Sequence, residues 1–265
     1  MDYNIQQWLP TTKKEVEQRG WKSIDVILFT GDAYVDHPSF GGAVIGRLLE
    51  SLGLNVAIVP QPNWQDDLRD FKKLGKPNLF FGISPGCMDS MVNHYTAAKR
   101  RRSDDAYTPG NRSGARPDIP TIVYTKILKE LFPDTPVIIG GIEASLRRFT
   151  HYDYWKDSLK PSILHESQAD MLIYGMGEKP LTEIFRMLQR GIPFQSLTNI
   201  PQTSVIRHKD EKYATNKKWQ TIMLASHEEC LSDKRKYATN FRYIEEESNS
   251  IHAAKLIQPI RDELI

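Results

Sequence analysis

Polar side chains and glycines gather in three short segments, each of which directly follows an apolar run of the chain. The first segment places Asp32, Asp36, His37 and Ser39 just ahead of Gly41. These residues supply carboxylates, an imidazole and a hydroxyl. They lie beside an expected helix start, where backbone N–H groups attract negative charge, so the segment favours binding of a polar or anionic ligand. The alternative is structural, with Asp36 forming a turn and Ser39 capping the helix.

The second and third segments are rich in glycine. Because glycine has no Cβ, a ligand or another stretch of backbone can approach it closely. These segments add the following candidate ligand-binding residues: Gly140, Gly141, Glu143, Ser145, Gly175, Gly177 and Glu178. Ligands of doubly wound sheets bind beyond the carboxyl ends of the strands, so the three segments are expected to share one sheet edge. For Glu178 the alternative role is a favourable charge in the first turn of a helix.

Short apolar runs alternate with helical patterns through the first 190 residues. The runs are 25–29, 55–59, 78–83, 136–139 and 170–174, and each is apolar on both faces, as strands between two helix layers are. This alternation predicts the α/β class. We expect a Rossmann-like, flavodoxin-type, doubly wound parallel sheet.

Apolar residues at helical spacing predict helices around 45–52, 124–131 and 181–188, with a weaker one at 66–74. Two stretches break the pattern. Residues 99–120 are polar and have almost no aliphatic side chains, which predicts a long loop. Residues 149–164 contain several aromatic side chains among charged ones, which predicts a packed, irregular segment outside the regular helices.

The alternation loosens toward the C-terminus. We therefore expect one domain over residues 1–195 and a smaller, irregular, α-rich segment over 196–265, with an edge strand near 203–207 and a charged helical tract at 226–248. The chain ends on Leu264 and Ile265 without a polar tail, which suggests a truncated end.

A basic run covers Lys99, Arg100, Arg101 and Arg102. Together with Arg112 and Arg116 it could contact the phosphates of RNA or of a nucleotide. A solvated loop is the alternative, since Asp104 and Asp105 directly follow the run and interrupt the positive charge.

The composition limits the classes of partner and location. The net charge is +2, from 35 Lys and Arg against 33 Asp and Glu, which gives no global attraction to nucleic acid or to an acidic membrane. Neither a signal pattern nor a membrane-length apolar run is present, so a cytoplasmic location is expected. The two cysteines, Cys87 and Cys230, are expected to be reduced thiols that form no metal site.

Several segments resemble a known family. Val137 to Gly141 and Ala169 to Glu178 look like strand-four and strand-five signatures of cobalamin-binding-type domains that precede radical S-adenosylmethionine (SAM) barrels. The chain as a whole is similar to the YgiQ family of uncharacterised radical SAM proteins. That resemblance is carried by the segments 31–41, 75–82, 102–110 and 141–148.

The resemblance implies a full-length protein with a barrel that binds a 4Fe–4S cluster and SAM through a Cys-x-x-x-Cys-x-x-Cys motif. That motif is absent here, so the chain supplies no cluster ligand. A cobalamin site is doubtful too, because the stretch from Asp36 to Gly41 lacks the Asp-x-His-x-x-Gly spacing.

The resemblance thus implies the N-terminal, accessory portion of a radical SAM iron–sulfur protein. Its expected role is to cover the barrel, which is a partner in cis, and to shape access for a substrate that the sequence does not identify. One alternative is an independent module that binds a nucleotide or a cobalamin-like ligand at the same sheet edge. Another is an RNA-associated protein that uses the basic run.

Overall fold

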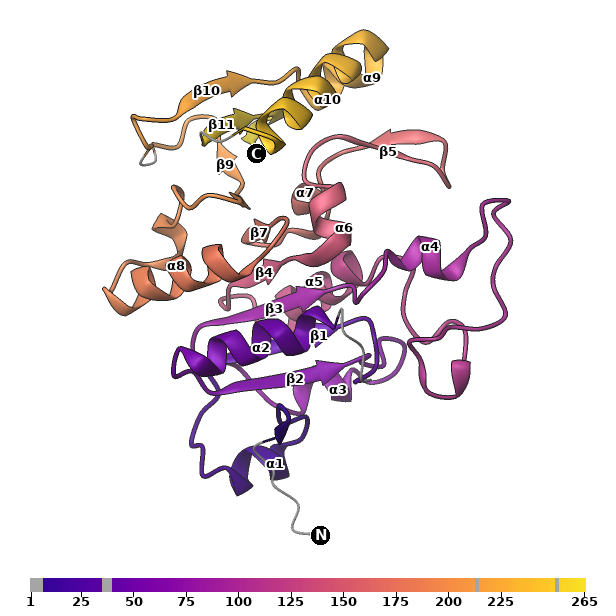
Figure 1. The fold of residues 1–265 in the computed structure, drawn as a ribbon, viewed down its shortest axis with the longest axis vertical. Coiled ribbons are helices and arrows are strands. Elements are labelled where there is room, and N and C mark those ends of the chain that lie inside the picture. Colours follow the sequence, from indigo (N-terminus) through magenta and orange to yellow (C-terminus); the bar gives the residue numbers. More distant parts are fainter. Residues whose placement is uncertain (1–6, 35–39, 213–214, 251–252) are drawn as a thin grey trace.

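The computed structural model describes residues 7–34, 40–212, 215–250 and 253–265, and a six-stranded sheet forms its centre (Figure 1). The strand order is β2-β1-β3-β4-β7-β8. The strands are β1 (Val26–Thr30), β2 (Val56–Pro60), β3 (Phe80–Ser84), β4 (Val137–Ile139), β7 (Met171–Ile173) and β8 (Thr203–Ser204). The first five are parallel, whereas β8 pairs antiparallel with β7 at the edge.

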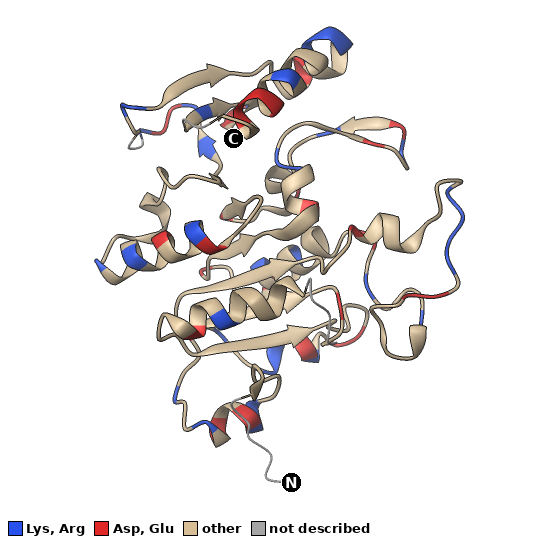
Figure 2. Ribbon diagram, viewed as in Figure 1, with Lys and Arg blue, Asp and Glu red and all other residues tan. Residues whose placement is uncertain are grey.

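The five parallel strands have the order 2-1-3-4-5 along the chain, which is the flavodoxin-like order of a doubly wound sheet. They begin and end within two residues of the predicted runs. Their 21 residues include no charged side chain, as Figure 2 shows, because both faces of the sheet are covered. The predicted α/β class is confirmed.

Helices cover the sheet on both faces (Figure 1). On one face, α2 (Gly41–Ser51) and α8 (Glu178–Gln189) pack with Val26 and Leu28 of β1 in one buried cluster. On the other face, α3 (Arg69–Lys72), α5 (Pro120–Leu131) and α7 (Ile163–Ser167) pack with Ile27 and Phe29 of the same strand. Alternate residues of β1 therefore enter opposite cores.

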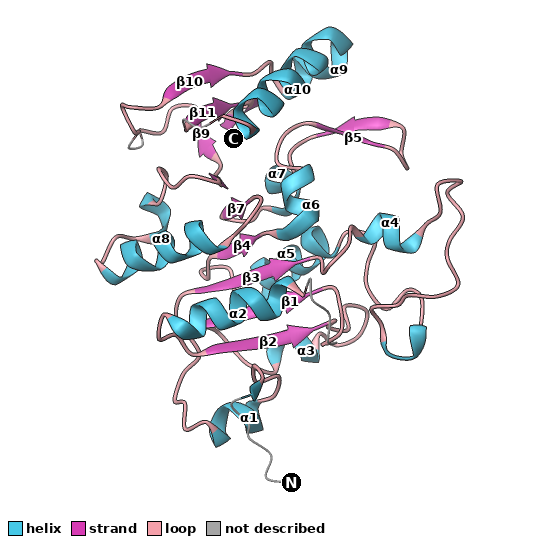
Figure 3. Cartoon of the chain, viewed as in Figure 1, coloured by secondary structure: helices cyan, strands magenta, loops and turns pink. Residues whose placement is uncertain are grey.

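Long connections leave the carboxyl ends of the strands (Figure 3). The connection between β3 and α5, residues 85–119, is called the excursion from here on. It contains α4 (Ser90–His94) and the 3₁₀ turn η2 (Pro109–Asn111), and most of the predicted loop at 99–120 is irregular. After β4, α6 (Gly141–Leu146) is followed by a hairpin of β5 (His151–Asp153) and β6 (Ser158–Lys160). The aromatic-rich stretch 149–164 is thus largely a hairpin.

The C-terminal part lies beyond the β7 and β8 end of the sheet (Figure 1). Its elements are η3 (Phe194–Ser196), β9 (Arg207–His208), β10 (Gln220–Met223), α9 (His227–Ser232), α10 (Lys234–Ser248), β11 (Ala254–Ile257), β12 (Pro259–Ile260) and β13 (Glu263–Leu264). The charged helical tract is confirmed as α9 and α10, which carry both signs of charge (Figure 2). The edge strand is confirmed for β8 only.

At the opposite end of the chain, α1 (Lys13–Gln18) starts with a capping box, in which the Thr12 hydroxyl and the Glu15 carboxylate satisfy each other's backbone N–H groups. Across the described residues, no helix combines the length and the apolar character needed to cross a bilayer.

Candidate functional site

A cavity of about 450 Å³ lies against the sheet between α2 and α8, at the carboxyl ends of β1, β3, β4 and β7. Its wall is mostly aliphatic, with Leu28, Ile45 and Ile173 among the lining residues. It brings together six of the candidate residues from all three segments: Gly41, Gly140, Gly141, Gly175, Gly177 and Glu178. The fold thus brings residues of all three segments to one sheet edge, as the sequence predicted.

Glycines give this cavity its space. A Cβ on Gly82, in the middle of β3, would lie 2.7 Å from Cδ2 of Leu28. Gly141 has a φ of +80°, and a Cβ there would lie 2.8 Å from Cδ of Pro85. At Gly140, which lines the cavity, the nearest atom to such a Cβ is the Ile173 carbonyl oxygen at 3.6 Å, an ordinary van der Waals contact, so a side chain could be added there without a clash at its Cβ.

Besides the Ser84 hydroxyl and the Glu178 carboxylate, the polar groups of the cavity come from the backbone. Three helices, α2, α6 and α8, begin beside it, and their N-cap residues are Phe40, Gly140 and Gly177, none of which has a side-chain acceptor. Helix N-termini favour negative partial charge. The arrangement therefore suits an apolar or planar group whose polar edge faces the helix starts.

Four exposed apolar side chains lie on segments that follow the strands. Val44 on α2 is 48% exposed and Met176, in the loop before α8, is 72% exposed, and both line the cavity. On α6, Ile142 is 38% exposed and Leu146 is 61% exposed. We call these four residues the apolar edge. Exposed apolar side chains that gather on one surface mark interaction sites in soluble proteins.

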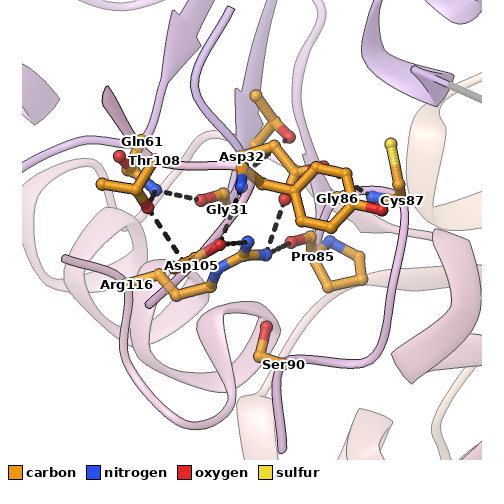
Figure 4. Close-up of polar contacts among 12 residues, drawn as sticks. Gly31, Asp32, Gln61, Pro85, Gly86, Cys87, Ser90, Asp105, Thr108 and Arg116 are labelled. Atoms are coloured by element: carbon orange, nitrogen blue, oxygen red, sulfur yellow. Dashed lines mark hydrogen bonds and ion pairs between the residues drawn. The ribbon is translucent and has the colours of Figure 1, made fainter. Parts of the chain in front are cut away.

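Beyond the carboxyl ends of β1 and β3, where ligands bind in many sheets of this topology, the chain forms a buried ion-pair network (Figure 4). Arg116 from the excursion lies between Asp32 and Asp105, at 2.6 Å from Oδ1 of Asp32 and 3.1 Å from Oδ1 of Asp105. Its guanidinium also donates to the carbonyl oxygen of Pro85 at 3.2 Å. The three charged side chains are at most 1% exposed. Asp32 thus holds the excursion in place and does not line the cavity.

Glycine makes this ion pair network possible. Gly86 has a φ of +113°, and a Cβ there would lie 2.1 Å from Oδ1 of Asp32. Burial alone would raise the pKa of Asp105, but the hydrogen bonds and charge of Arg116 outweigh it and lower that pKa. The pKa of the Cys87 thiol is raised to about 12. Burial is the largest cause, and the hydrogen bond and charge of Asp32 add to it.

Glu143 is fully buried on α6. Its Oε1 accepts the backbone N–H of Ser90 at 3.2 Å, and its Oε2 accepts the N–H of Thr121 at 3.3 Å and the Thr121 hydroxyl at 2.7 Å. Burial, followed by the nearby charge of Asp89, raises the pKa of Glu143. Glu143 therefore connects both ends of the excursion to α6 by hydrogen bonds.

Ser145 does not line this cavity. It accepts the backbone N–H of Gly175 at 3.1 Å and lines a neighbouring cavity. Asp36, His37 and Ser39 lie outside the described residues.

The basic run Lys99, Arg100, Arg101 and Arg102 is exposed on the excursion, where Nζ of Lys99 donates to the Trp155 carbonyl oxygen at 3.1 Å. Arg116 differs from this run: it is buried and neutralised, so its proposed contact with phosphate is wrong.

Sequence reasoning missed the pairing of Arg116 with Asp32 and Asp105 and the burial of Glu143. The signal that was available was the unusual concentration of Asp, Arg and Gly in the excursion. Because a charge that is buried needs a partner, such a polar stretch between two core elements can indicate an internal ion pair as well as a binding surface.

The residues present do not fit an iron–sulfur cluster. Cys87 follows β3 and Cys230 lies on α9, and burial is the largest cause of the raised pKa of each thiol, although cluster ligands must be thiolates. Within the part of the chain that the structure describes, no group of three His, Cys, Asp or Glu side chains could hold a metal ion.

Comparison with known proteins matches the chain to the family model described as Radical SAM N-terminal over residues 8–265. A UPF0313 protein of Porphyromonas gingivalis is 63% identical over 261 residues, which are 98% of this chain and 41% of that protein. UPF0313 proteins of Bacteroides thetaiotaomicron and Geobacter sulfurreducens are 58% and 48% identical, over 100% and 95% of this chain and 44% and 41% of theirs. The chain spans about two fifths of the length of these curated relatives. It belongs to the Radical SAM N-terminal family.

Proposed function

We propose that the chain acts as the N-terminal, accessory portion of a radical SAM iron–sulfur protein of the YgiQ type, in which it covers the catalytic barrel and shapes access for the substrate. The family model supports the family, and the relatives, more than twice as long, leave room for a barrel. In such a protein the 4Fe–4S cluster, bound elsewhere, would supply the electron that cleaves SAM to a carbon radical.

The observation that carries this proposal is the apolar edge, the exposed side chains Val44, Ile142, Leu146 and Met176, of which Val44 and Met176 line the cavity. Covering such side chains with a second apolar surface lowers the free energy by about 25 cal/mol for each Å² removed from water. All four belong to segments at the carboxyl ends of the strands. We infer that this edge faces the barrel and that its side chains exclude water from the barrel opening.

The test mixes this 265-residue chain with a separately produced polypeptide that comprises the part of the Porphyromonas relative beyond the matched region. Binding is measured by isothermal titration calorimetry. The double variant Leu146→Asp, Met176→Asp should weaken the association at least about tenfold, because two charges would be buried against an apolar surface. The matched control is Met223→Asp, Leu231→Asp, since these side chains are equally exposed at 58% each but lie on the C-terminal part.

Two results would count against the proposal. If both double variants bind like the unmodified chain, the apolar edge does not face the barrel. If the control alone loses binding, the barrel docks on the C-terminal part instead. Circular dichroism of each variant confirms that the substitutions at these exposed sites leave the fold intact.

A second candidate function rests on the cavity between α2 and α8. Its volume of about 450 Å³ lies in the range of small-molecule sites, and its aliphatic wall with three helix starts favours a planar ligand with a polar edge. We propose as the alternative that the chain binds a nucleotide or a cobalamin-like ligand here. The RNA-associated alternative stays a prediction, since the basic run is exposed but is directly followed by Asp104 and Asp105.

The alternative is tested by titrating the chain with hydroxocobalamin, whose colour reports binding, and with ATP in a parallel experiment. Gly140→Val should abolish binding of whichever probe binds, because the new side chain would occupy the cavity without a close contact. Ala97→Val, at an exposed position outside the cavity, is the control for an enlarged side chain. Binding that survives Gly140→Val would place the ligand elsewhere.

A further inference from the structure

A second cavity, of about 630 Å³, lies between the β7 and β8 end of the sheet and the C-terminal part. We infer that it binds a small organic oxyanion, a carboxylate or a phosphate, through the guanidinium of Arg148. This inference does not depend on the barrel or on the cavity between α2 and α8.

The first argument is the unusual environment of Arg148. Its Nη1 donates to the Ser145 carbonyl oxygen at 2.6 Å, its Nη2 donates to the Ser248 hydroxyl at 3.1 Å, and its guanidinium lies 5.0 Å from the centre of the Tyr174 ring. These contacts fix the plane of the guanidinium but leave further N–H donors for another acceptor, because an arginine has five.

The second argument is that Arg148 lacks an ion pair. Arg116 and Arg147 each have a buried one, with Asp32 and Asp89 respectively. Arg148 forms no ion pair with a carboxylate that the structure describes; burial lowers its pKa, and the charges of Tyr174 and of the more distant Glu245 do not offset this. A partly buried arginine that is held in a fixed plane without a carboxylate suits an exchangeable anion, which can accept two parallel hydrogen bonds.

The lining of the cavity indicates the kind of molecule. Tyr174 and Trp219 supply aromatic surface, and Gln202, Thr203 and Ser204 supply polar groups. A volume of this size accommodates a small organic molecule rather than a simple ion. Glu247 also lines the cavity and opposes an anion, so the negative group of the ligand should lie on the Arg148 side.

Isothermal titration calorimetry of the 265-residue chain with pyrophosphate and, separately, with citrate tests the proposal and distinguishes the two kinds of oxyanion. We expect at least one probe to bind at millimolar or lower concentration. Arg148→Gln should weaken binding by about tenfold or more, since hydrogen bonds to a charged group are lost. Arg148→Lys should weaken it less, because the charge stays while the planar fork is lost.

Two further variants make the test independent of folding defects. Glu247→Gln should strengthen binding by about two- to threefold, since it removes an opposing charge and leaves Arg148 in place. Arg190→Gln, at an exposed position near the end of α8, should bind as the unmodified chain does. The inference is overturned if neither probe binds at millimolar concentration, or if binding is the same in the Arg148 and Glu247 variants as in the unmodified chain.

Discussion

At the scale of single residues, the buried arginines Arg116 and Arg147 are neutralised by carboxylates of the chain itself. Arg116 is shared between Asp32 and Asp105, and Asp89 pairs with Arg147 while it caps α4. Taking a charge out of water costs several kcal/mol unless a partner and hydrogen bonds compensate. The buried polar residues of the excursion therefore stabilise the fold through ion pairs and hydrogen bonds.

Removal of Arg116 should destabilise the chain strongly. Arg116→Ala leaves Asp32 and Asp105 buried without a counter-charge, for which we expect a loss of about 3–5 kcal/mol in the free energy of unfolding. Urea unfolding followed by circular dichroism measures it. Arg112→Ala, at an exposed position of the same excursion, should change stability by less than about 0.5 kcal/mol. Equal effects of the two variants would contradict the role of the network.

His151 should make the protein sensitive to mild acid. Burial lowers its pKa to about 4, so between pH 6.5 and pH 4 the unfolded chain binds a proton that the folded chain excludes. Stability from this residue is complete above about pH 6.5 and falls as the pH falls toward 4, by about 1–2 kcal/mol after allowance for partial exposure. His151→Gln should show a smaller loss of unfolding free energy between pH 7 and pH 4.5. An unchanged slope would refute this.

At the scale of elements, the connection from β3 to α5 is anchored at both ends. Arg116 joins it to the loop after β1, and Glu143 on α6 accepts hydrogen bonds from Ser90 and Thr121. The excursion therefore belongs to the sheet edge, although its sequence has the polarity of a mobile loop. Its exposed surface, which includes the basic run, is held in a defined place relative to the cavity.

Glu143→Ala should release this connection selectively. Two backbone N–H groups and one hydroxyl would lose their acceptor, at a cost of about 2–4 kcal/mol. Hydrogen–deuterium exchange should then increase in residues 90–121 and remain slow in β1 and β3. Ile142→Ala, which alters the exposed neighbour on α6, should leave the exchange pattern unchanged. Faster exchange throughout the sheet would instead mean that Glu143 supports the whole core.

At the scale of the whole molecule, one edge of the sheet concentrates the features expected of an interface. The cavity, the helix starts and the apolar edge all lie at the carboxyl ends of the parallel strands. A parallel sheet produces this concentration because every connection that leaves a strand starts on the same side. The second cavity lies next to it, since Gly175 lines both.

The proposed accessory role of this chain predicts that iron binds to the remainder of the full-length protein. After anaerobic treatment with iron and sulfide, this chain should retain no cluster, because it has two cysteines and burial raises the pKa of both thiols. The full-length Porphyromonas relative, treated in the same way, should acquire the visible absorption of a 4Fe–4S cluster. Stoichiometric iron and sulfide on this chain alone would contradict the accessory role.

The sequence by itself determined the class of fold and the place of the cavity. Apolar runs and helical spacing are local patterns, so they located the five parallel strands to within two residues and predicted α2, α5 and α8. The strand-end rule then placed Gly41, Gly140 and Gly175 at one edge, and the cavity found there is lined by all three.

Only the tertiary structure decided which polar residues line a cavity and which pair with each other. Asp32 and Asp105 are 73 positions apart and Glu143 is 22 positions from Thr121, so nothing in the local pattern links them. Arg147 and Arg148 are adjacent in sequence, yet one is ion-paired and the other is not. Burial and pairing depend on distance in space, which the packing of the excursion and of the C-terminal part against the sheet establishes.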